Sequence, residues 1–402
     1  MDKQFNRRDF LKNAGTTAAA FTILDSRLVR GSQANSKIKL GVIGTGGRGT
    51  WIARLFRDHG GYEIHAAADY FQDRVDDFGG ELIVEPARRF TGLNGYKRLL
   101  EIDVDAVAII SPPYFHPMQA ADSVDAGKHV FLAKPIAVDV PGCMSVQQSG
   151  DKARANKLVY LVDFQTRTHE YFQEAVKRVQ YGEIGNVVCG EALYHCGPTW
   201  DRMYHYFETG EISQENKLKA WGLFRTLSGD VITEQNIHAL DVAAWFLDDK
   251  PVRATGSAGQ NRQFGDCHDY FSVTYEFPND VLISFNSKQL GQGYDDITCR
   301  VYGENGTVHT DYFGEVWIRG ERPYKGGKVR GLYESGAVSN IKDFHTNVMN
   351  GRYANSTVEP SVRSNLTTIL GRMAAYQEKW VTWDEMMDAN EKWTADLMGL
   401  EQ

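Results

Sequence analysis

Apolar and polar positions recur along the chain with two different periods. Up to about residue 156, short apolar runs such as "KLGVI", "YEIHAAA", "AVAII" and "HVFLA" alternate with segments that have the spacing of amphipathic helices. From about 187 to 330, apolar positions recur every second residue, as in "DYFSVTYEF" and "DVLISFNSKQ", between turns such as Asn305-Gly306. After residue 330 the helical period returns.

These periods predict an α/β protein with two domains. Strands that alternate with helices are typical of a doubly wound parallel sheet, which we place at residues 35–156. Period-two strands joined by short turns are typical of a mostly antiparallel sheet. We place that sheet and the later helices in a second domain at residues 157–402.

A glycine-rich turn follows the first predicted strand. Gly44, Gly46 and Gly49 form the pattern G-x-G-x-x-G, and a helical pattern begins directly after it. The first glycine permits a tight turn, the second lets a pyrophosphate approach the backbone, and the third lets the helix pack on the strand. We therefore expect Gly44, Gly46, Gly47, Arg48 and Gly49 to contact a dinucleotide at the helix N-terminus.

The second predicted strand ends in a carboxylate. Asp69 stands twenty residues after Gly49. A carboxylate at this place accepts hydrogen bonds from both ribose hydroxyls and repels a 2′-phosphate. We expect NAD as the cofactor, and NADP is the less favoured alternative because Arg48 and Arg74 offer positive charge.

Polar residues also follow the next two predicted strands. The turn after "AVAII" contains Ser111, Pro112 and His116, and Lys134 follows "HVFLA". Parallel sheets bind ligands at the carboxyl ends of their strands, so we expect these four residues at the cofactor site. A lysine there can also donate to a substrate hydroxyl or take part in a proton relay.

The segment "SGDVITEQNIHALDVAAWFLD", residues 228–248, has the pattern of one continuous helix. At about 100° per residue, Glu234, His238 and Asp241 fall within roughly 60° of one another. A salt-bridged helix face and a catalytic site are both compatible with this arrangement.

Three features together resemble the glucose-fructose oxidoreductase, inositol dehydrogenase and rhizopine catabolism (Gfo/Idh/MocA) family. They are the glycine turn, the segment "PPYFHPMQAADSVDAGKHVFLAKPIA" and the later acid-x-x-x-His segment. The resemblance implies an N-terminal Rossmann domain and a C-terminal α+β domain with a large open sheet. That sheet often makes dimer or tetramer contacts in the family, so we expect a homodimer or homotetramer.

The resemblance also implies roles for three residues. Lys134 matches the catalytic lysine of the family's "EKP" motif, although Ala133 stands where the family has glutamate. His238 matches the histidine that faces the nicotinamide, and its imidazole can accept a hydroxyl proton near neutral pH. Glu234, one turn earlier, would hold the imidazole in one orientation, and Lys134 would polarise the same substrate oxygen.

Four further residues are candidates for substrate contacts. Arg167 follows a predicted strand, Asp241 follows His238, and the stretch "YHCGPTWDRMYHY" contains His195 and Trp200. Aromatic rings beside polar groups suit the two faces of a sugar ring, but they serve equally well in a core.

Charge and composition narrow the class of partner. The 402 residues carry a formal net charge of −8, which argues against a nucleic acid or an anionic membrane as partner. The 11 histidines and 5 cysteines show no metal-ligand spacing, so we expect no metal. The expected partner is a small sugar, glycoside or cyclitol.

Residues 1–34 have the pattern of an export signal. Arg7 and Arg8 precede the weakly apolar run "NAGTTAAAFTIL", and Ser32 to Ala34 offer small residues to a signal peptidase. We expect a periplasmic or otherwise exported protein that uses the twin-arginine route, or a cytoplasmic protein if the signal does not function.

Three functions are compatible with these features. We favour an NAD-dependent dehydrogenase that oxidises a secondary hydroxyl of a sugar, glycoside or cyclitol, in particular a glycoside 3-dehydrogenase. The alternative is a glycosidase that oxidises C3, eliminates the aglycone, adds water and reduces the ketone again. It needs a second base, for which Tyr194, His195 and His205 are candidates, and the resembling glycosidases lack the lysine that this chain has at 134. A non-catalytic NAD-binding sensor is the third.

Overall fold

The computed structural model describes residues 37–208, 210 and 212–402. The predicted export signal lies outside these residues.

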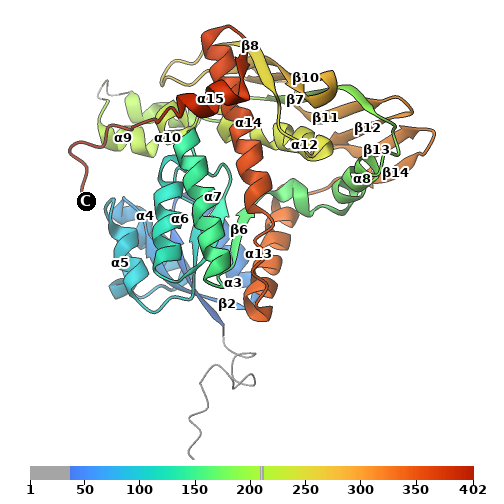
Figure 1. The fold of residues 1–402 in the computed structure, drawn as a ribbon. Coiled ribbons are helices and arrows are strands. Elements are labelled where there is room, and N and C mark those ends of the chain that lie inside the picture. Colours follow the sequence, from blue (N-terminus) through green and yellow to red (C-terminus); the bar gives the residue numbers. More distant parts are fainter. Residues whose placement is uncertain (1–36, 209, 211) are drawn as a thin grey trace, which may run out of the picture. The chain divides into compact units, whose positions relative to one another are not determined.

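The first sheet has six strands in the order β3-β2-β1-β4-β5-β6, and all its neighbours pair in parallel. Figure 1 labels two of these strands, β2 and β6, in the blue and green part of the chain. Its strands are β1 (Ile38–Ile43), β2 (Tyr62–Ala68), β3 (Arg89–Phe90), β4 (Ala106–Ile109), β5 (His129–Ala133) and β6 (Tyr160–Asp163). The order reverses between β1 and β4, and a doubly wound sheet binds its ligand beyond the strand ends at such a point. The predicted Rossmann sheet is confirmed.

Helices cover both faces of this sheet, because its strands are apolar on both sides. One apolar core joins the sheet to α3, α4 and α13, and the other joins it to α5, α6 and α7. These helices are α3 (Gly47–His59), α4 (Gln72–Leu82), α5 (Gly95–Glu101), α6 (His116–Asp125), α7 (Val140–Ala155) and α13 (Leu332–Asn350).

The predicted boundary after residue 156 is wrong in two respects. β6 pairs with β5, so the Rossmann sheet continues to Asp163. α13, although it lies late in the sequence, packs its Ala337, Ile341 and Phe344 against the first domain. A single apolar strand such as β6 has the same pattern in either sheet, and only its pairing assigns it to one of them.

The second sheet has nine strands in the order β14-β13-β12-β11-β7-β10-β9-β8-β15. β7 and β10 pair in parallel, and all other neighbours are antiparallel. The strands are β7 (Val187–Cys196), β8 (Arg253–Gly259), β9 (Tyr270–Phe277), β10 (Val281–Gln289), β11 (Asp296–Gly303), β12 (Gly306–Asp311), β13 (Glu315–Gly320), β14 (Tyr324–Lys328) and β15 (Val381–Thr382). The predicted mostly antiparallel sheet is confirmed.

Three helices pack on one face of the second sheet: α8 (Glu170–Gln180), α12 (Ile237–Leu247) and α14 (Val358–Gln377). Along β7 the buried residues Ala192 and Tyr194 face these helices. Shorter helices complete this domain: η4 (Gln165–Thr168), η5 (Asp201–Phe207), α9 (Gln214–Lys219), η6 (Trp221–Leu223), α10 (Arg225–Ser228), α11 (Val231–Glu234) and α15 (Trp383–Ala389). No helix of the described residues is long and apolar enough to span a bilayer.

The segment 228–248 is not the continuous helix that its pattern predicts. α10 ends at Ser228 and is capped by Gly229, whose φ is 84°, and Asp230, with φ 70°, caps α11 through its own side chain. α11 ends at Glu234, and α12 begins only at Ile237. The cause is local, because a glycine C-cap and an aspartate N-cap both interrupt a helix without changing its apolar period.

Candidate active site

The glycine turn connects β1 to α3 in a conformation that excludes side chains. Gly44 has φ 92°, and a Cβ there would lie 2.5 Å from the backbone nitrogen of Ser111. A Cβ at Gly49 would lie 1.8 Å from the carbonyl oxygen of Gly44. Both positions therefore require glycine, and the N-terminus of α3 is left open toward a phosphate.

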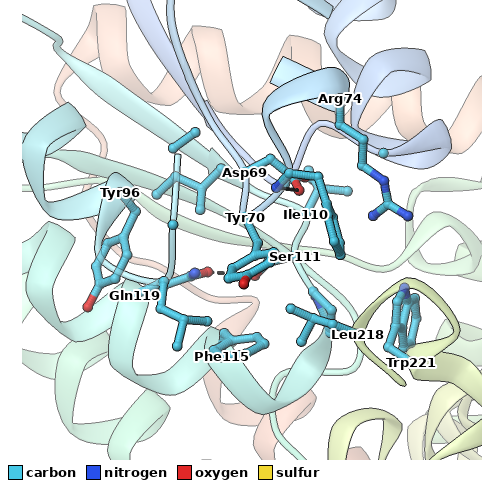
Figure 2. A pocket seen from close by; sticks show the side chains of 18 residues that line it. Asp69, Tyr70, Arg74, Tyr96, Ile110, Ser111, Phe115, Gln119, Leu218 and Trp221 are labelled. Atoms are coloured by element: carbon cyan, nitrogen blue, oxygen red, sulfur yellow. Dashed lines mark hydrogen bonds between the residues drawn. The ribbon is translucent and has the colours of Figure 1, made fainter. Parts of the chain in front are cut away.

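Beyond this turn lies a hollow that is open to solvent, and Figure 2 shows the side chains that line it. Asp69 lines it at the end of β2 and accepts the backbone N–H of Thr45 at 2.8 Å. The other lining residues include Gly44, Gly46, Ser111 and Pro112 from the first domain, and Leu218 and Trp221 from the second. A glycine turn, a carboxylate and apolar walls fit the adenosine end of NAD.

Asp69 provides a direct test of the cofactor. Replacing Asp69 with serine removes a charged acceptor for the ribose hydroxyls, so we expect KM for NAD to rise about 10- to 100-fold. The preference for NAD over NADP should fall at the same time. Steady-state kinetics with both cofactors measures this, with Asp73→Ser on the exposed first turn of α4 as control. An unchanged ratio of the two KM values would contradict this role of Asp69.

Two of the predicted cofactor residues make other contacts. His116 is buried, and its ring nitrogens lie 2.8 Å from the carbonyl oxygen of Pro135 and 2.7 Å from that of Ser111. Its side chain therefore joins the turn after β4 to the segment after Lys134 and does not line the hollow. Arg48 likewise turns away from the hollow. Its Nη2 donates to Asp163 at 2.9 Å.

Lys134 and Glu234 form a buried pair between the two domains. The Nζ of Lys134 donates to the carbonyl oxygen of Glu234 at 2.5 Å and lies 3.5 Å from its Oε1. Burial raises the pKa of Glu234 to about 7, although the charges of Lys134 and Arg48 oppose this shift. Burial lowers the pKa of Lys134, and Glu234 opposes that change. The carboxylate of Glu234 therefore takes up a proton at a higher pH than a surface glutamate, and the ammonium of Lys134 loses its proton at a lower pH than a surface lysine.

His238 stands on the first turn of α12 and is buried. Its ring centroid lies 5.8 Å from that of Tyr312, and its Nδ1 has no hydrogen-bond partner among the described residues. Burial, together with the charges of Lys134 and Arg48, holds the pKa of His238 well below its usual value. The imidazole is therefore neutral near pH 7 and can accept a proton.

The predicted hydrogen bond from Glu234 to His238 is not formed. In the described part of the chain, Glu234 Oε1 contacts Lys134, while Glu234 Oε2 and His238 Nδ1 have no partner. The reason is the break between α11 and α12, since the two residues no longer lie on one continuous helix face. Glu234 acts on Lys134 instead.

Arg167 and Asp241, both predicted to bind substrate, bind each other. Arg167 Nη2 lies 2.8 Å from Asp241 Oδ1, and Ser364 donates to the same oxygen at 2.7 Å. Asp241 is completely buried. Its carboxylate is thus engaged in joining η4, α12 and α14, which corrects the assignment of Asp241 to a substrate hydroxyl.

This pair gives a prediction about stability. Asp241→Ala leaves the Arg167 guanidinium without its counter-charge, so we expect the free energy of unfolding to fall by about 3–5 kcal/mol. Urea titration followed by circular dichroism measures this change. If stability stays unchanged while KM for substrate rises, Asp241 contacts substrate after all.

His195 and Trp200 also lie elsewhere than predicted. Successive side chains of a strand point to opposite faces, so His195 is on the open face of the second sheet while Tyr194 faces the helices. The ring of His195 lies 6.2 Å from that of Tyr294 on that open face. Trp200 is buried and packs on Trp221, at 5.1 Å between centroids, in a small core of its own.

Four residues that the sequence did not single out for the site contact Tyr194, Arg48 or His238. The Tyr194 hydroxyl donates to Gln235 at 2.9 Å. Arg48 donates to the Tyr333 hydroxyl at 2.5 Å and forms the ion pair with Asp163. Asp163 ends a parallel strand, as Asp69 does, so the same signal could have found it. Tyr312, Tyr333 and Gln235 have no such signal.

The parallel sheet, its glycine turn, Asp69 and the lysine–glutamate–histidine group define an NAD-binding oxidoreductase. The family model "Oxidoreductase family, NAD-binding Rossmann fold" matches residues 38–164, and the model "GFO/IDH/MocA C-terminal domain" matches residues 172–309. The chain belongs to the GFO/IDH/MocA family.

Individual relatives agree with this membership. Inositol 2-dehydrogenase 3 of Saccharopolyspora erythraea is 30% identical over 67% of this chain and 72% of its own length. A glycosyl hydrolase family 109 protein of Shewanella woodyi is 28% identical over 76% of this chain and 71% of its own. The structure of scyllo-inositol dehydrogenase from Lactobacillus casei with NAD(H) and scyllo-inositol has the same fold, with a TM-score of 0.68 and 18% identity, covering 87% of this chain and 100% of that one.

Proposed function

We propose that this oxidoreductase oxidises a secondary hydroxyl of a sugar, glycoside or cyclitol to a ketone, and that it is in particular a glycoside 3-dehydrogenase. The observation that carries the proposal is the buried Lys134–Glu234 pair together with the buried His238 imidazole, whose pKa is lowered by burial and by the nearby charge of Lys134. A base and a cation at one position are what the removal of a hydroxyl proton requires.

Each residue of the group has a distinct task. His238 accepts the proton of the substrate hydroxyl. Lys134 donates a hydrogen bond to the same oxygen and stabilises its negative charge as the proton leaves. Glu234, when ionised, keeps Lys134 cationic. NAD, held by the glycine turn and Asp69, supplies the acceptor for the hydride of the carbinol carbon.

The substrate class is supported by the relatives. One is named for inositol and another for glycosyl hydrolysis, and both names point to ring compounds with secondary hydroxyls. If the chain is exported, it meets glycosides outside the cytoplasm, which favours the glycoside as substrate.

A glycosidase that oxidises and re-reduces its substrate is the second candidate, because of the family 109 relative. It requires a base for the C2 proton. His195 points to the open face of the sheet, and His205 is exposed with its Nδ1 2.6 Å from the Arg202 carbonyl oxygen. Burial raises the pKa of Tyr194 well above that of a free phenol. The two histidines lie on the open face or on the surface, and the tyrosine holds its proton too tightly to act as a base. These three findings favour the dehydrogenase.

Product analysis tests the choice. The purified protein is incubated with NAD and a panel of glycosides and cyclitols, and the products are identified by mass. Loss of two hydrogens from an intact substrate, matched by reduced nicotinamide, supports the dehydrogenase. Released aglycone without net reduction of NAD supports the glycosidase. Binding of NAD without either product supports the non-catalytic sensor.

The pH dependence of kcat follows from Glu234. Its pKa of about 7 means that the carboxylate becomes protonated as the pH falls below 7. Lys134 then loses the negative charge that favours its cationic form, so we expect kcat to fall with pH on the acid side of about 7. Measured profiles of the wild type and of Glu234→Gln check this. The variant should have a lower kcat and should lack this ionisation, and an unaltered profile would exclude Glu234.

We also propose export by the twin-arginine route, on the basis of Arg7 and Arg8. Replacing both with lysine should keep the chain in the cytoplasmic fraction. Equal distribution of both forms would contradict export.

For assembly, we propose a homodimer or homotetramer that uses the open face of the second sheet. Tyr270 and Leu282 are among the exposed large apolar residues on that side. Light scattering of the wild type and of Leu282→Glu tests this, since a monomeric wild type would exclude it.

A further inference from the structure

The turn before α11 has a backbone conformation that aspartate rarely adopts. Asp230 has φ 70° and ψ 164° and is completely buried. Glycine occupies this region almost alone, so another residue remains there only when its surroundings hold it. The carbonyl oxygen of Asp230 accepts the backbone N–H of Glu234 at 2.8 Å. The conformation of Asp230 therefore determines where Glu234 lies.

Groups from outside the turn hold the side chain of Asp230. The hydroxyl of Tyr376, on α14, donates to Oδ2, and the backbone N–H of His268 donates to Oδ1 at 3.1 Å. His268 Nδ1 lies 3.4 Å from Oδ2, and the rings of His268 and Tyr376 are 4.7 Å apart. The carboxylate is thus fixed between α14 and His268, which stands two residues before β9.

Arg372 holds the preceding residue of the same turn. Its Nη1 donates to the carbonyl oxygen of Gly229 at 2.7 Å. The guanidinium is buried and stacks on the Trp393 ring at 3.6 Å, which limits its movement. Arg372 and Tyr376 are four residues apart on one helix, so the same face of α14 contacts both residues of the turn. Figure 1 shows α14 as the long orange-red helix.

We propose that Asp230, Tyr376 and Arg372 are positioning residues for the Glu234–Lys134 pair. They hold the Gly229–Asp230 turn, whose carbonyl anchors Glu234, and the Glu234 carbonyl in turn accepts the Lys134 ammonium at 2.5 Å. The proposal rests on the proposed function, in which this pair acts at the substrate oxygen.

The most direct variant is Tyr376→Phe, which removes one hydroxyl and keeps the ring. Loss of this tether lets the turn relax and Glu234 move away from Lys134, so we expect kcat to fall about 10- to 100-fold, as small displacements of catalytic groups do. KM and NAD affinity should not change. The positive charge of Lys134 lowers the pKa of Glu234, and this effect weakens as the two groups move apart. The pKa of Glu234 should therefore rise, and the acid limb of the kcat profile should move to higher pH.

Tyr275→Phe is a matched control. Tyr275 is completely buried, its hydroxyl has no partner among the described residues, and it lies against Gly371 on the same helix. Tyr275→Phe likewise removes one buried hydroxyl and keeps the ring, but it leaves the contacts of the Gly229–Asp230 turn unchanged. We expect the control to keep the wild-type kcat and pH profile.

A purely structural role would give a different result. If Tyr376→Phe lowers the melting temperature but leaves kcat and the acid limb unchanged, or if Tyr275→Phe has the same effects, the proposal is wrong. The ionisation of Glu234 can also be followed without substrate, through the infrared carboxyl band that Glu234→Gln removes. A shift of that band's titration in Tyr376→Phe supports the positioning role even if the panel yields no product, and an unshifted titration overturns it.

Discussion

Replacing His238 with alanine should lower kcat about 1,000-fold, because it removes the base that accepts the substrate proton. In the structure the imidazole is neutral, since burial and the nearby charges of Lys134 and Arg48 keep its pKa well below the usual value. The ring does not line the cofactor hollow, so NAD affinity should stay the same. Steady-state kinetics and fluorescence titration with NAD measure the two quantities.

Chemical rescue separates loss of the base from loss of the fold. Added imidazole should restore part of the activity of His238→Ala, because the cavity left by the side chain accepts the free ring. His309→Ala is the control, since His309 lies on the opposite face of the second sheet, stacked on Trp317 at 4.9 Å. Full activity of His238→Ala would show that another group is the base.

Lys134→Met should lower kcat about 100- to 1,000-fold, which is the usual effect of removing one charged donor to a developing oxyanion. Methionine keeps the length and apolar character of the stem but cannot donate to the substrate oxygen. The buried carboxyl of Glu234 then loses the cation that opposes its protonation, so its pKa should rise further. Because Glu234 acts on the reaction through Lys134, the acid limb near pH 7 should be absent from the remaining activity.

The control for this variant is Lys128→Met. Lys128 is also a lysine of the parallel-sheet domain, but within the described part of the chain its Nζ donates to the carbonyl oxygens of Ile102 and Val104 and to no other group. We expect Lys128→Met to keep the wild-type kcat. Equal losses in both variants would mean that Lys134 acts through stability and not at the substrate.

Local patterns predicted NAD as the cofactor and the strand ends that line the hollow. The glycine turn, Asp69 and Lys134 each depend on a strand end, and the ends of parallel strands converge on one edge of the sheet. Asp163 also ends a parallel strand and lies at the same edge, although it was not singled out from the sequence. Arg48 and His116 were misplaced because the direction of a side chain depends on what surrounds it, which the neighbouring sequence does not specify.

The substrate half depended on contacts between residues far apart in the chain. The segment 228–248 has a helical period throughout, but Gly229 and Asp230 break it, and the carboxylate of Glu234 meets Lys134, a hundred residues earlier, instead of His238. Asp241 and Arg167 pair across 74 positions. His195 lies on the open face of the second sheet, and strand alternation alone could not show this, because it tells which residues share a face but not which face the helices cover.

The sequence by itself determined the α/β plan with one parallel and one mostly antiparallel sheet, the dinucleotide turn and NAD as the cofactor, and it singled out Lys134, Glu234 and His238 as candidates. These follow from periodicity and from motifs whose chemistry is local. Only the tertiary structure decided which of the candidate polar side chains are occupied by buried partners and which are available to a substrate. Asp241 and His116 are engaged by buried partners, whereas the imidazole of His238 is left neutral and without a bond at Nδ1 among the described residues. The reason is that burial and hydrogen-bond partners, which set the charge of a group, are supplied by segments distant in sequence.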